Sequence, residues 1–336
     1  MATAPSTKIS VVIPTFNRRV LLRELLASLL RQSFPSAAIE IIVIDDGSTD
    51  GTRAMVEEMA GSAPCAMRIH LQDHQGQAAA RNHGVARATG EIIAFIDSDC
   101  TAHPDWLQNA VRRLGPDTAF VSGSVHDKPG QPVTFFSLRH GAPGYEFPTY
   151  PTCNVLYRKD KFLAYGGFDP AKVLPVGPGG AKKGCEDADL AWKMKRAGEE
   201  HRFAGDAIVY HEVVTFSPLG WVLEGRRLWI LAFDLKHVPE VGRMGFLHWG
   251  VFTTRHGPFR LLFAAGVLAG AALHPLWFAL AAPYLLLALR ALKDDFVRPG
   301  RVHRGLVKLV LGAGRYLVEL GAMLYGSVRF RCLVLP

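Results

Sequence analysis

Two aspartates separated by a single serine, Asp97-Ser98-Asp99, follow an apolar run at residues 92–96. In an extended segment, side chains two positions apart point to the same side of the chain. Two carboxylates on one side can hold a hard divalent cation, Mg²⁺ or Mn²⁺, together with the phosphates of a substrate. A motif this short more often forms a solvated turn, but its place directly after an apolar strand favours a metal and phosphate site.

A second acidic pair, Asp45-Asp46, stands at the end of the apolar run 39–44 and is followed by Gly47-Ser48. Acidic side chains at the carboxyl end of a strand can accept hydrogen bonds from a ribose or from the edge of a base. The alternative is a strand-end turn in which Ser48 or Asp50 caps the next helix. The glycine spacing is not that of G-x-G-x-x-G, so the sequence has no motif for dinucleotide binding.

A third acidic pair, Glu186-Asp187, opens a predicted helix over 187–197, after a loop rich in Gly, Pro and Lys. Negative charge is favourable at a helix N-terminus, so capping alone would explain these residues. The same helix terminus would help to keep Asp187 ionised at neutral pH, which a general base needs in order to deprotonate an acceptor hydroxyl. The residues alone leave both interpretations open.

The elements that must position these acids alternate between strands and helices. Apolar runs predict strands at 9–13, 39–44, 67–71, 91–96 and 119–125, and helical patterns occupy 20–31, 52–60, 77–88 and 105–114. This alternation is typical of an α/β fold with a mostly parallel sheet flanked by helices. Ligands of such sheets bind beyond the carboxyl ends of the strands, so we expect the first two acidic pairs to converge on one side of the sheet.

The character of the chain changes near residue 221. Residues 1–210 carry 23 basic and 23 acidic side chains, whereas residues 211–336 carry 15 and 7, which accounts for the whole net charge of +8. Residues 261–289 contain no charged side chain, and only His274-Pro275 interrupts them. We expect a re-entrant membrane hairpin, because one crossing helix would leave the basic segment 290–336 on the far side, against the positive-inside rule. The alternative is a buried hairpin of a soluble protein, since each arm is shorter than a full span.

Residues 305–325 predict an interfacial helix with Lys308, Arg315 and Glu319 on one face. We therefore expect a catalytic domain at 1–220 and a helical, basic, membrane-associated region at 221–336, at the cytoplasmic face of the cell membrane and against its anionic surface. The five widely spaced cysteines form no C-x-x-C pair, and residues 1–8 lack an apolar run. These features favour reduced cytosolic thiols and no signal peptide. No zinc-finger, RNP or basic-zipper pattern indicates nucleic acid.

Five segments stand in a characteristic order: Ser10–Arg18 (SVVIPTFNR), Val43–Asp50 (VIDDGSTD), Ala80–Gly84 (ARNHG), Ala94–Asp99 (AFIDSD) and Glu186–Leu190 (EDADL). This order resembles that of the family 2 glycosyltransferases, over about residues 8–212. Each segment is short, but five in order are specific. The resemblance implies a GT-A fold, a divalent metal, and transfer of a sugar from a nucleotide diphosphate with inversion at the anomeric carbon.

The resemblance also implies roles for single residues. Pro14, Thr15 and Asn17 would line the nucleotide pocket, Asp45 or Asp46 would hold the base or ribose, Arg81 would face the nucleotide, and Asp97 would contact the sugar nucleotide. Asp99 would be the main ligand of Mn or Mg, with Asp97 and His211 as further candidates. Asp187, with Glu186 beside it, would be the general base.

The implied reaction moves a sugar from a UDP-, GDP- or dTDP-sugar to a hydroxyl of a glycan or lipid-linked acceptor, in the synthesis of cell-envelope polysaccharide or glycolipid. A polyprenyl-phosphate sugar transferase is the alternative, because it shares the fold and the donor chemistry but attacks from a phosphate. A sugar nucleotidyltransferase is less favoured, since Pro14–Arg19 contains no glycine where such enzymes carry a phosphate loop. A membrane scaffold would not need converging carboxylates.

Overall fold

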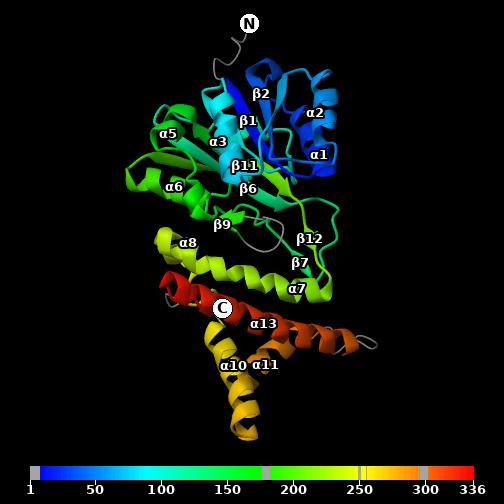
Figure 1. The fold of residues 1–336 in the computed structure, drawn as a ribbon, viewed down its shortest axis with the longest axis vertical. Helices are drawn as coiled ribbons and strands as arrows, with labels where there is room; N and C mark the ends of the chain where they lie inside the picture. Colours follow the sequence, from blue (N-terminus) through cyan, green and yellow to red (C-terminus); the bar gives the residue numbers. More distant parts are fainter. Residues whose placement is uncertain (1–7, 176–181, 249–250, 255, 294, 296–301) are drawn as a thin grey trace. The chain divides into compact units, whose positions relative to one another are not determined.

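The computed structural model describes residues 8–175, 182–248, 251–254, 256–293, 295 and 302–336. The chain forms two compact units, and many of their elements are labelled in Figure 1. The first unit contains the residues up to 132 and residues 139–214, and the second contains residues 133–138 and 215–336. The short segment 133–138 belongs to the second unit because its strand β7 (Ser137–Leu138) pairs with β12 (Val214–Thr215).

An eight-stranded sheet runs through the first unit in the order β3-β2-β1-β4-β8-β6-β11-β5. Its strands are β1 (Ile9–Thr15), β2 (Ile39–Asp45), β3 (Ala66–Leu71), β4 (Ile92–Phe95), β5 (Cys100–Ala102), β6 (Thr118–Asp127), β8 (Val155–Arg158) and β11 (Glu200–His211). The β3-β2-β1-β4 pairings are all parallel, as is β6 with β11, whereas β8 and β5 are antiparallel to their neighbours. The expected α/β fold with a largely parallel sheet is confirmed. The sequence did not predict β5 and β8, which have only three and four residues.

Helices cover both faces of this sheet, which explains why every residue of β1 and β2 is buried. On one face, Leu25, Val56 and Leu107 pack with the strands, and on the other face Val85, Phe162 and Leu190 do so. The helices are α1 (Arg19–Leu29), α2 (Thr52–Ala60), α3 (Gln77–Arg87), α4 (Trp106–Val111), α5 (Lys159–Ala164) and α6 (Glu186–Arg196), with the short turns η1 (Ser36–Ala38) and η2 (Pro170–Lys172). A small hairpin, β9 (Val173–Pro175) with β10 (Lys182–Gly184), precedes α6.

Helix α3 lies very close to β1 at Gly84. A Cβ atom at this position would lie 2.4 Å from Val12 Cγ1, so only glycine fits without movement of the strand. Residues three apart share one face of a helix, and Arg81 therefore faces the sheet as Gly84 does. The close approach explains the glycine of the ARNHG segment and brings Arg81 to the carboxyl ends of the strands.

The second unit is helical. Its elements are α7 (Pro218–Glu224), η3 (Gly225–Ile230), α8 (Leu231–His237), α9 (Pro239–Val241), η4 (Gly242–Phe246), α10 (Gly257–Ala272), η5 (Pro275–Ala281), α11 (Ala282–Ala291) and α13 (Val302–Phe330). The chain reverses at His274, whose Nδ1 accepts a hydrogen bond from Leu276 N at 3.2 Å. After this reversal, Phe278 packs against α10 at Gly270, so α10 and η5–α11 form a helical hairpin. None of the helices in the described ranges is both long enough and apolar enough to cross a bilayer.

Candidate active site

The carboxyl ends of β1, β2 and β4 lie next to one another and carry two of the three acidic pairs. Thr15, at the end of β1, stands beside Asp45 at the end of β2. Asp97 follows the last residue of β4 by two positions. Pro14 lies inside β1, opposite Ile44. The hydroxyl of Thr15 is buried and has no hydrogen-bond partner among the described residues.

The two acids at the end of β2 differ in the number of hydrogen bonds that their carboxylate oxygens accept. Oδ1 of Asp46 accepts hydrogen bonds from Gln72 Nε2 (2.7 Å) and Gln75 N (2.8 Å), and Oδ2 accepts one from Gly76 N (2.9 Å). Asp45 is equally buried, and its Oδ1 accepts a hydrogen bond from Ser48 N at 2.9 Å. Asp46 therefore organises the loop before α3, a structural task that the sequence did not separate from ligand binding.

The loop after β1 presents an aromatic ring that the sequence analysis missed. Asn17 adopts a left-handed conformation (φ 51°), and its Oδ1 accepts a hydrogen bond from Thr49 N at 2.8 Å. The neighbouring Phe16 is 39% exposed, and its ring lies 4.4 Å from the ring of His74. Exposed aromatic surfaces of this kind can stack on a nucleobase. A single aromatic residue in a loop makes no pattern, so only its position in the fold identifies it.

Asp97-Ser98-Asp99 forms a turn, and the expectation of an extended segment is wrong. A hydrogen bond from Cys100 N to Asp97 O at 3.0 Å closes the turn before β5 begins. The two carboxylates consequently have different partners. Asp97 Oδ1 lies 2.7 Å from Arg81 Nη2, whereas Asp99 pairs with Arg18. Strand alternation therefore does not orient these acids.

Arg81 connects Asp97 with the third acidic pair. Its side chain is 2% exposed, and its Nη1 lies 3.4 Å from Glu186 Oε1. Burial alone would lower the pKa of the Arg81 guanidinium, but the charges of Asp97 and Glu186 outweigh burial and raise the pKa. One buried cation thus holds acids from two separate segments in a single cluster.

Helix α6 begins with the two acids of the third pair. Glu186 is buried against Arg81, and this burial raises its pKa above the ordinary value although the charge of Arg81 opposes the shift. Asp187 is half-buried, and its Oδ1 accepts a hydrogen bond from Ala188 N at 2.7 Å. Asp187 is therefore the more accessible carboxylate of the pair.

Asp99, Cys100 and His211 are a possible metal-ligand group within the described ranges, with one donor atom of each within 4.8 Å of the others. His211 Nδ1 lies 3.0 Å from the carbonyl of Glu212, which can only accept, so Nδ1 carries the proton and Nε2 is left for a metal. Burial would raise the pKa of Asp99, but the charge that His211 carries when its ring is protonated, together with the charge of Arg18, holds this pKa below its ordinary value. Burial raises the pKa of the Cys100 thiol well above its usual range, which makes Cys100 a poor ligand. Asp99 and His211 thus fit a divalent ion.

Arg18 is a residue of this centre that the sequence analysis missed. Burial alone would lower the pKa of its guanidinium, but the charges of Asp99 and Asp97 raise it. Arg18 therefore supplies positive charge to both acids of the turn. Its sequence signal is weak, since one basic residue after a strand is common, and its partners lie about 80 positions away along the chain.

Comparison with known proteins identifies the family. Residues 10–168 match the family model described as glycosyl transferase family 2. Glycosyltransferase AglE of Haloferax volcanii is 34% identical over 229 residues, which cover 63% of this chain and 69% of AglE. This chain belongs to glycosyltransferase family 2. Matches to two further curated relatives cover only 36% and 42% of the lengths of those proteins.

Two solved structures share the fold of this glycosyltransferase. The mannosyltransferase PcManGT from Pyrobaculum calidifontis, in complex with GDP-Man and Mn²⁺, has a TM-score of 0.55 at 21% identity, over 95% of this chain and 89% of PcManGT. S. aureus TarS 1–349, in complex with UDP, has a TM-score of 0.51 at 20% identity, over 96% and 91% of the two chains. The expected GT-A fold is confirmed, and the chain is a nucleotide-sugar glycosyltransferase.

Removing the charge of Arg81 should destabilise the glycosyltransferase, because Glu186 would then lie buried, and Asp97 partly buried, without their common partner. We expect Arg81→Met to lower the free energy of unfolding by about 3–5 kcal/mol, as measured by urea denaturation. Arg53→Met is the control, because Arg53 pairs with Glu57 on an exposed helix face, and the unfolding midpoint of this variant should not change. A wild-type midpoint for Arg81→Met would contradict the bridging role.

Proposed function

We propose that this glycosyltransferase moves a sugar, with inversion, from a nucleotide diphosphate sugar to a hydroxyl of a glycan or lipid-linked acceptor in cell-envelope polysaccharide or glycolipid synthesis. The observation that carries the proposal is the Arg81 bridge, 2.7 Å from Asp97 and 3.4 Å from Glu186. The bridge brings the acids after β4 and those at the start of α6 into one centre. A single displacement needs this proximity, because one end holds the leaving diphosphate and the other takes the acceptor proton.

The nucleotide would bind beyond the ends of β1 and β2. We assign the ribose or base contact to Asp45, since both oxygens of Asp46 already accept hydrogen bonds from the loop before α3. The unpaired hydroxyl of Thr15 and the ring of Phe16 would complete this pocket, with Pro14 and Asn17 shaping its backbone. PcManGT is in complex with GDP-Man and TarS with UDP. The fold thus accommodates either nucleotide, and UDP-, GDP- and dTDP-sugars are all candidate donors here.

Asp99 and His211 would hold a divalent ion, with Asp97 alongside. Bound Mn²⁺ or Mg²⁺ would offset the negative charge that develops on the diphosphate. The presence of Mn²⁺ in the PcManGT complex supports a metal in this chain. Arg18 pairs with Asp99 and would therefore face the same diphosphate. A guanidinium group can bind two phosphate oxygens at once.

Asp187 would remove the proton of the acceptor hydroxyl. Its position at the N-terminus of α6 favours the ionised carboxylate. Glu186 is buried against Arg81 and would position the acids of the donor side. A phosphate acceptor, as in a polyprenyl-phosphate sugar transferase, is already ionised and would need no base, so an accessible Asp187 favours a hydroxyl acceptor.

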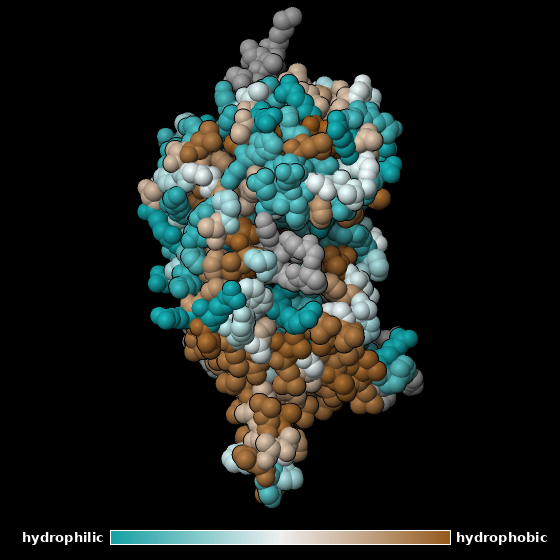
Figure 2. Space-filling view, viewed as in Figure 1, coloured by the Kyte–Doolittle hydropathy of each residue, from teal (hydrophilic) through white to brown (hydrophobic). Residues whose placement is uncertain are grey.

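The second unit would hold the enzyme at the cytoplasmic face of the membrane. Hydrophobic residues gather on the surface of this unit (Figure 2), and Leu268, Leu273 and Leu276 of the hairpin are 66%, 75% and 78% exposed. Exposed apolar side chains that gather on one surface mark a membrane or protein interaction site. Lys293 follows the hairpin and would lie near anionic headgroups. We propose that the hairpin inserts into one leaflet.

A donor panel tests the proposed reaction. The purified full-length protein in neutral detergent is incubated with UDP-, GDP- and dTDP-sugars, and release of the nucleoside diphosphate is followed with Mn²⁺ and with EDTA. Release that depends on the metal, from one donor, is the expected result and identifies base and sugar together. Release of pyrophosphate from a nucleoside triphosphate, or no turnover of any donor with a membrane lipid extract present, would overturn the proposal.

A further inference from the structure

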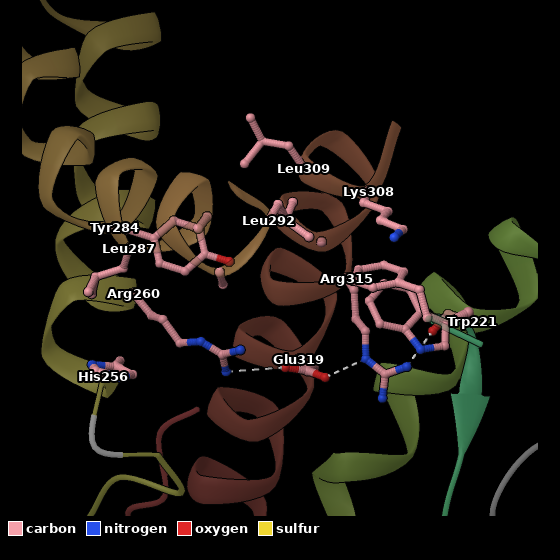
Figure 3. Close-up of a pocket in the computed structure, with 14 residues that line it drawn as sticks. Trp221, His256, Arg260, Tyr284, Leu287, Leu292, Lys308, Leu309, Arg315 and Glu319 are labelled. Carbon is pink, nitrogen blue, oxygen red and sulfur yellow. Dashed lines mark hydrogen bonds and ion pairs between the residues drawn. The ribbon is translucent and has the colours of Figure 1, made fainter. Parts of the chain in front are cut away.

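A cavity of about 370 Å³ lies within the second unit, between α13 and the base of the α10–η5–α11 hairpin (Figure 3). Its volume falls in the range of small-molecule sites, about 300–1,000 Å³. The wall has two different sides. Tyr284, Leu287, Leu292 and Leu309 form an apolar side, and Arg260, Glu319 and Arg315 form a charged row. A wall of this composition suits a ligand with an anionic head and an apolar chain.

The charged row is held by fixed contacts. Arg315 Nε donates to Glu319 Oε1 at 2.7 Å, and Arg260 Nη1 lies 3.7 Å from Glu319 Oε2. Both guanidinium groups also lie over aromatic rings: Arg315 is 4.4 Å from the ring centre of Trp221, and Arg260 is 5.2 Å from that of Tyr316. The two cations are therefore positioned before any ligand arrives, which lowers the cost of binding.

These contacts use few of the available donors. Each guanidinium carries five N–H donors. Arg315 gives one to Glu319 and one to Trp221 O at 2.9 Å, and the side chain of Arg260 makes no hydrogen bond with the described residues. Lys308, on the same wall, pairs with Asp295 at 2.6 Å. The two arginines and Glu319 keep one net positive charge and most of their donors, so the matching ligand is an anion with several oxygens.

We propose that this cavity binds the phosphate-bearing head of a membrane lipid. The phosphate oxygens would accept hydrogen bonds from Arg260 and Arg315, and the first carbons of the chain would lie against Tyr284 and Leu292. A free phosphate would leave the apolar wall without a partner, which is why we assign a lipid. The inference rests on the proposed membrane insertion of the same unit.

The position of Arg260 along α10 agrees with a lipid phosphate. Arg260 precedes Ala272, the last residue of α10, by twelve residues, which is about 18 Å of helix. Half of the hydrocarbon core of a bilayer is about 15 Å thick. A hairpin inserted along the bilayer normal, with its tip near the midplane, would therefore place Arg260 at the level of the headgroup phosphates.

Filling the cavity is the first arm of the test. A Cβ atom at Gly312 or Gly321 would meet no atom within 4 Å, and both positions lie on α13, but only Gly312 lines the cavity. Leucine favours a helix more than glycine does, so both variants should fold. Dodecyl phosphate is titrated into the full-length protein in neutral detergent, and binding is followed by tryptophan fluorescence. We expect Gly312→Leu to weaken binding at least about tenfold, and Gly321→Leu to bind as the wild type does.

Removing one charge is the second arm. Arg260→Gln should weaken the binding of dodecyl phosphate by about tenfold or more. Arg290→Gln removes the same charge from an exposed position of α11 outside the cavity, so its affinity should match the wild type. Equal losses in the matched variants of either arm would overturn the inference. In the arginine pair, equal losses would indicate adsorption to a basic surface.

Further probes distinguish the source of the phosphate and separate this inference from the proposed function. Binding of inorganic phosphate as tight as that of dodecyl phosphate, or binding of dodecanol as tight, would overturn a lipid-phosphate site. The affinities for farnesyl phosphate and dodecyl phosphate are compared in order to distinguish an isoprenoid lipid from a lipid with linear chains. Binding of either compound supports the site. Turnover of the sugar donor is measured on the same preparations. Turnover without lipid-phosphate binding overturns this inference alone. Lipid-phosphate binding without turnover supports this inference and contradicts the proposed function.

Discussion

Asp187→Asn should abolish sugar transfer while the nucleotide sugar still binds. Loss of a general base costs about 100- to 10,000-fold in kcat. The nucleotide would contact the ends of β1 and β2, whereas Asp187 is on α6, so the affinity for the donor nucleotide should stay close to that of the wild type. Steady-state transfer assays measure the first quantity, and calorimetric titration of the nucleoside diphosphate with Mn²⁺ measures the second.

The matched control is Asp189→Asn. Asp189 belongs to the same first turn of α6, but its Oδ1 lies 3.8 Å from Lys172 Nζ. The Asp189→Asn substitution removes the same charge from the same helix end. The transfer activity of this variant should remain near that of the wild type. Full transfer by Asp187→Asn would point to an acceptor that is already ionised, as in a polyprenyl-phosphate sugar transferase. Loss of nucleotide binding in that variant would instead move Asp187 to the donor side.

The strands that position the site could be predicted from the sequence because they are fully buried. β1 and β2 are covered on both faces, so each is mostly apolar and can be detected by local inspection, and the acids after the apolar residues of β2 follow directly. Antiparallel β8 has four residues and β5 has three, too few to show a period. The segment 133–138 joins the second unit through β7, a pairing of two-residue strands that no local pattern reveals.

The pairing of side chains in the site could not be predicted in the same way. Arg18 pairs with Asp99 across 81 positions, and Arg81 faces Glu186 across 105 positions. Such pairs depend on which strand ends become neighbours and on how a turn such as Asp97–Cys100 directs its carboxylates. The acidic residue types can be seen in the sequence, but the different roles of the two acids in a pair depend on tertiary hydrogen bonds. Asp46 is an example, because its hydrogen bonds to the loop before α3 show a structural role that the sequence does not reveal.

Asp99→Asn should remove metal-dependent turnover of the donor. An amide keeps the size of the carboxylate but loses the charge that, with His211, suits a hard cation. Losing one preorganised electrostatic contact at a leaving group costs about 100- to 1,000-fold in kcat. The affinity for Mn²⁺, measured by electron paramagnetic resonance without donor, should fall in parallel. Asp206→Asn is the control, because Asp206 is half exposed, pairs with Arg113 at 3.8 Å, and should change neither quantity.

The pairing of Asp99 with Arg18 offers a second explanation for such a loss, and Arg18→Gln separates the two. If Asp99 only holds Arg18 in place, Arg18→Gln should reproduce the defects of Asp99→Asn. If Asp99 is a metal ligand, Arg18 competes with the cation for the same carboxylate, and its removal should leave Mn²⁺ binding intact or tighten it. Turnover should still fall in Arg18→Gln, since the diphosphate loses a guanidinium partner. Weaker Mn²⁺ binding in Arg18→Gln than in the wild type would therefore argue against Asp99 as a ligand.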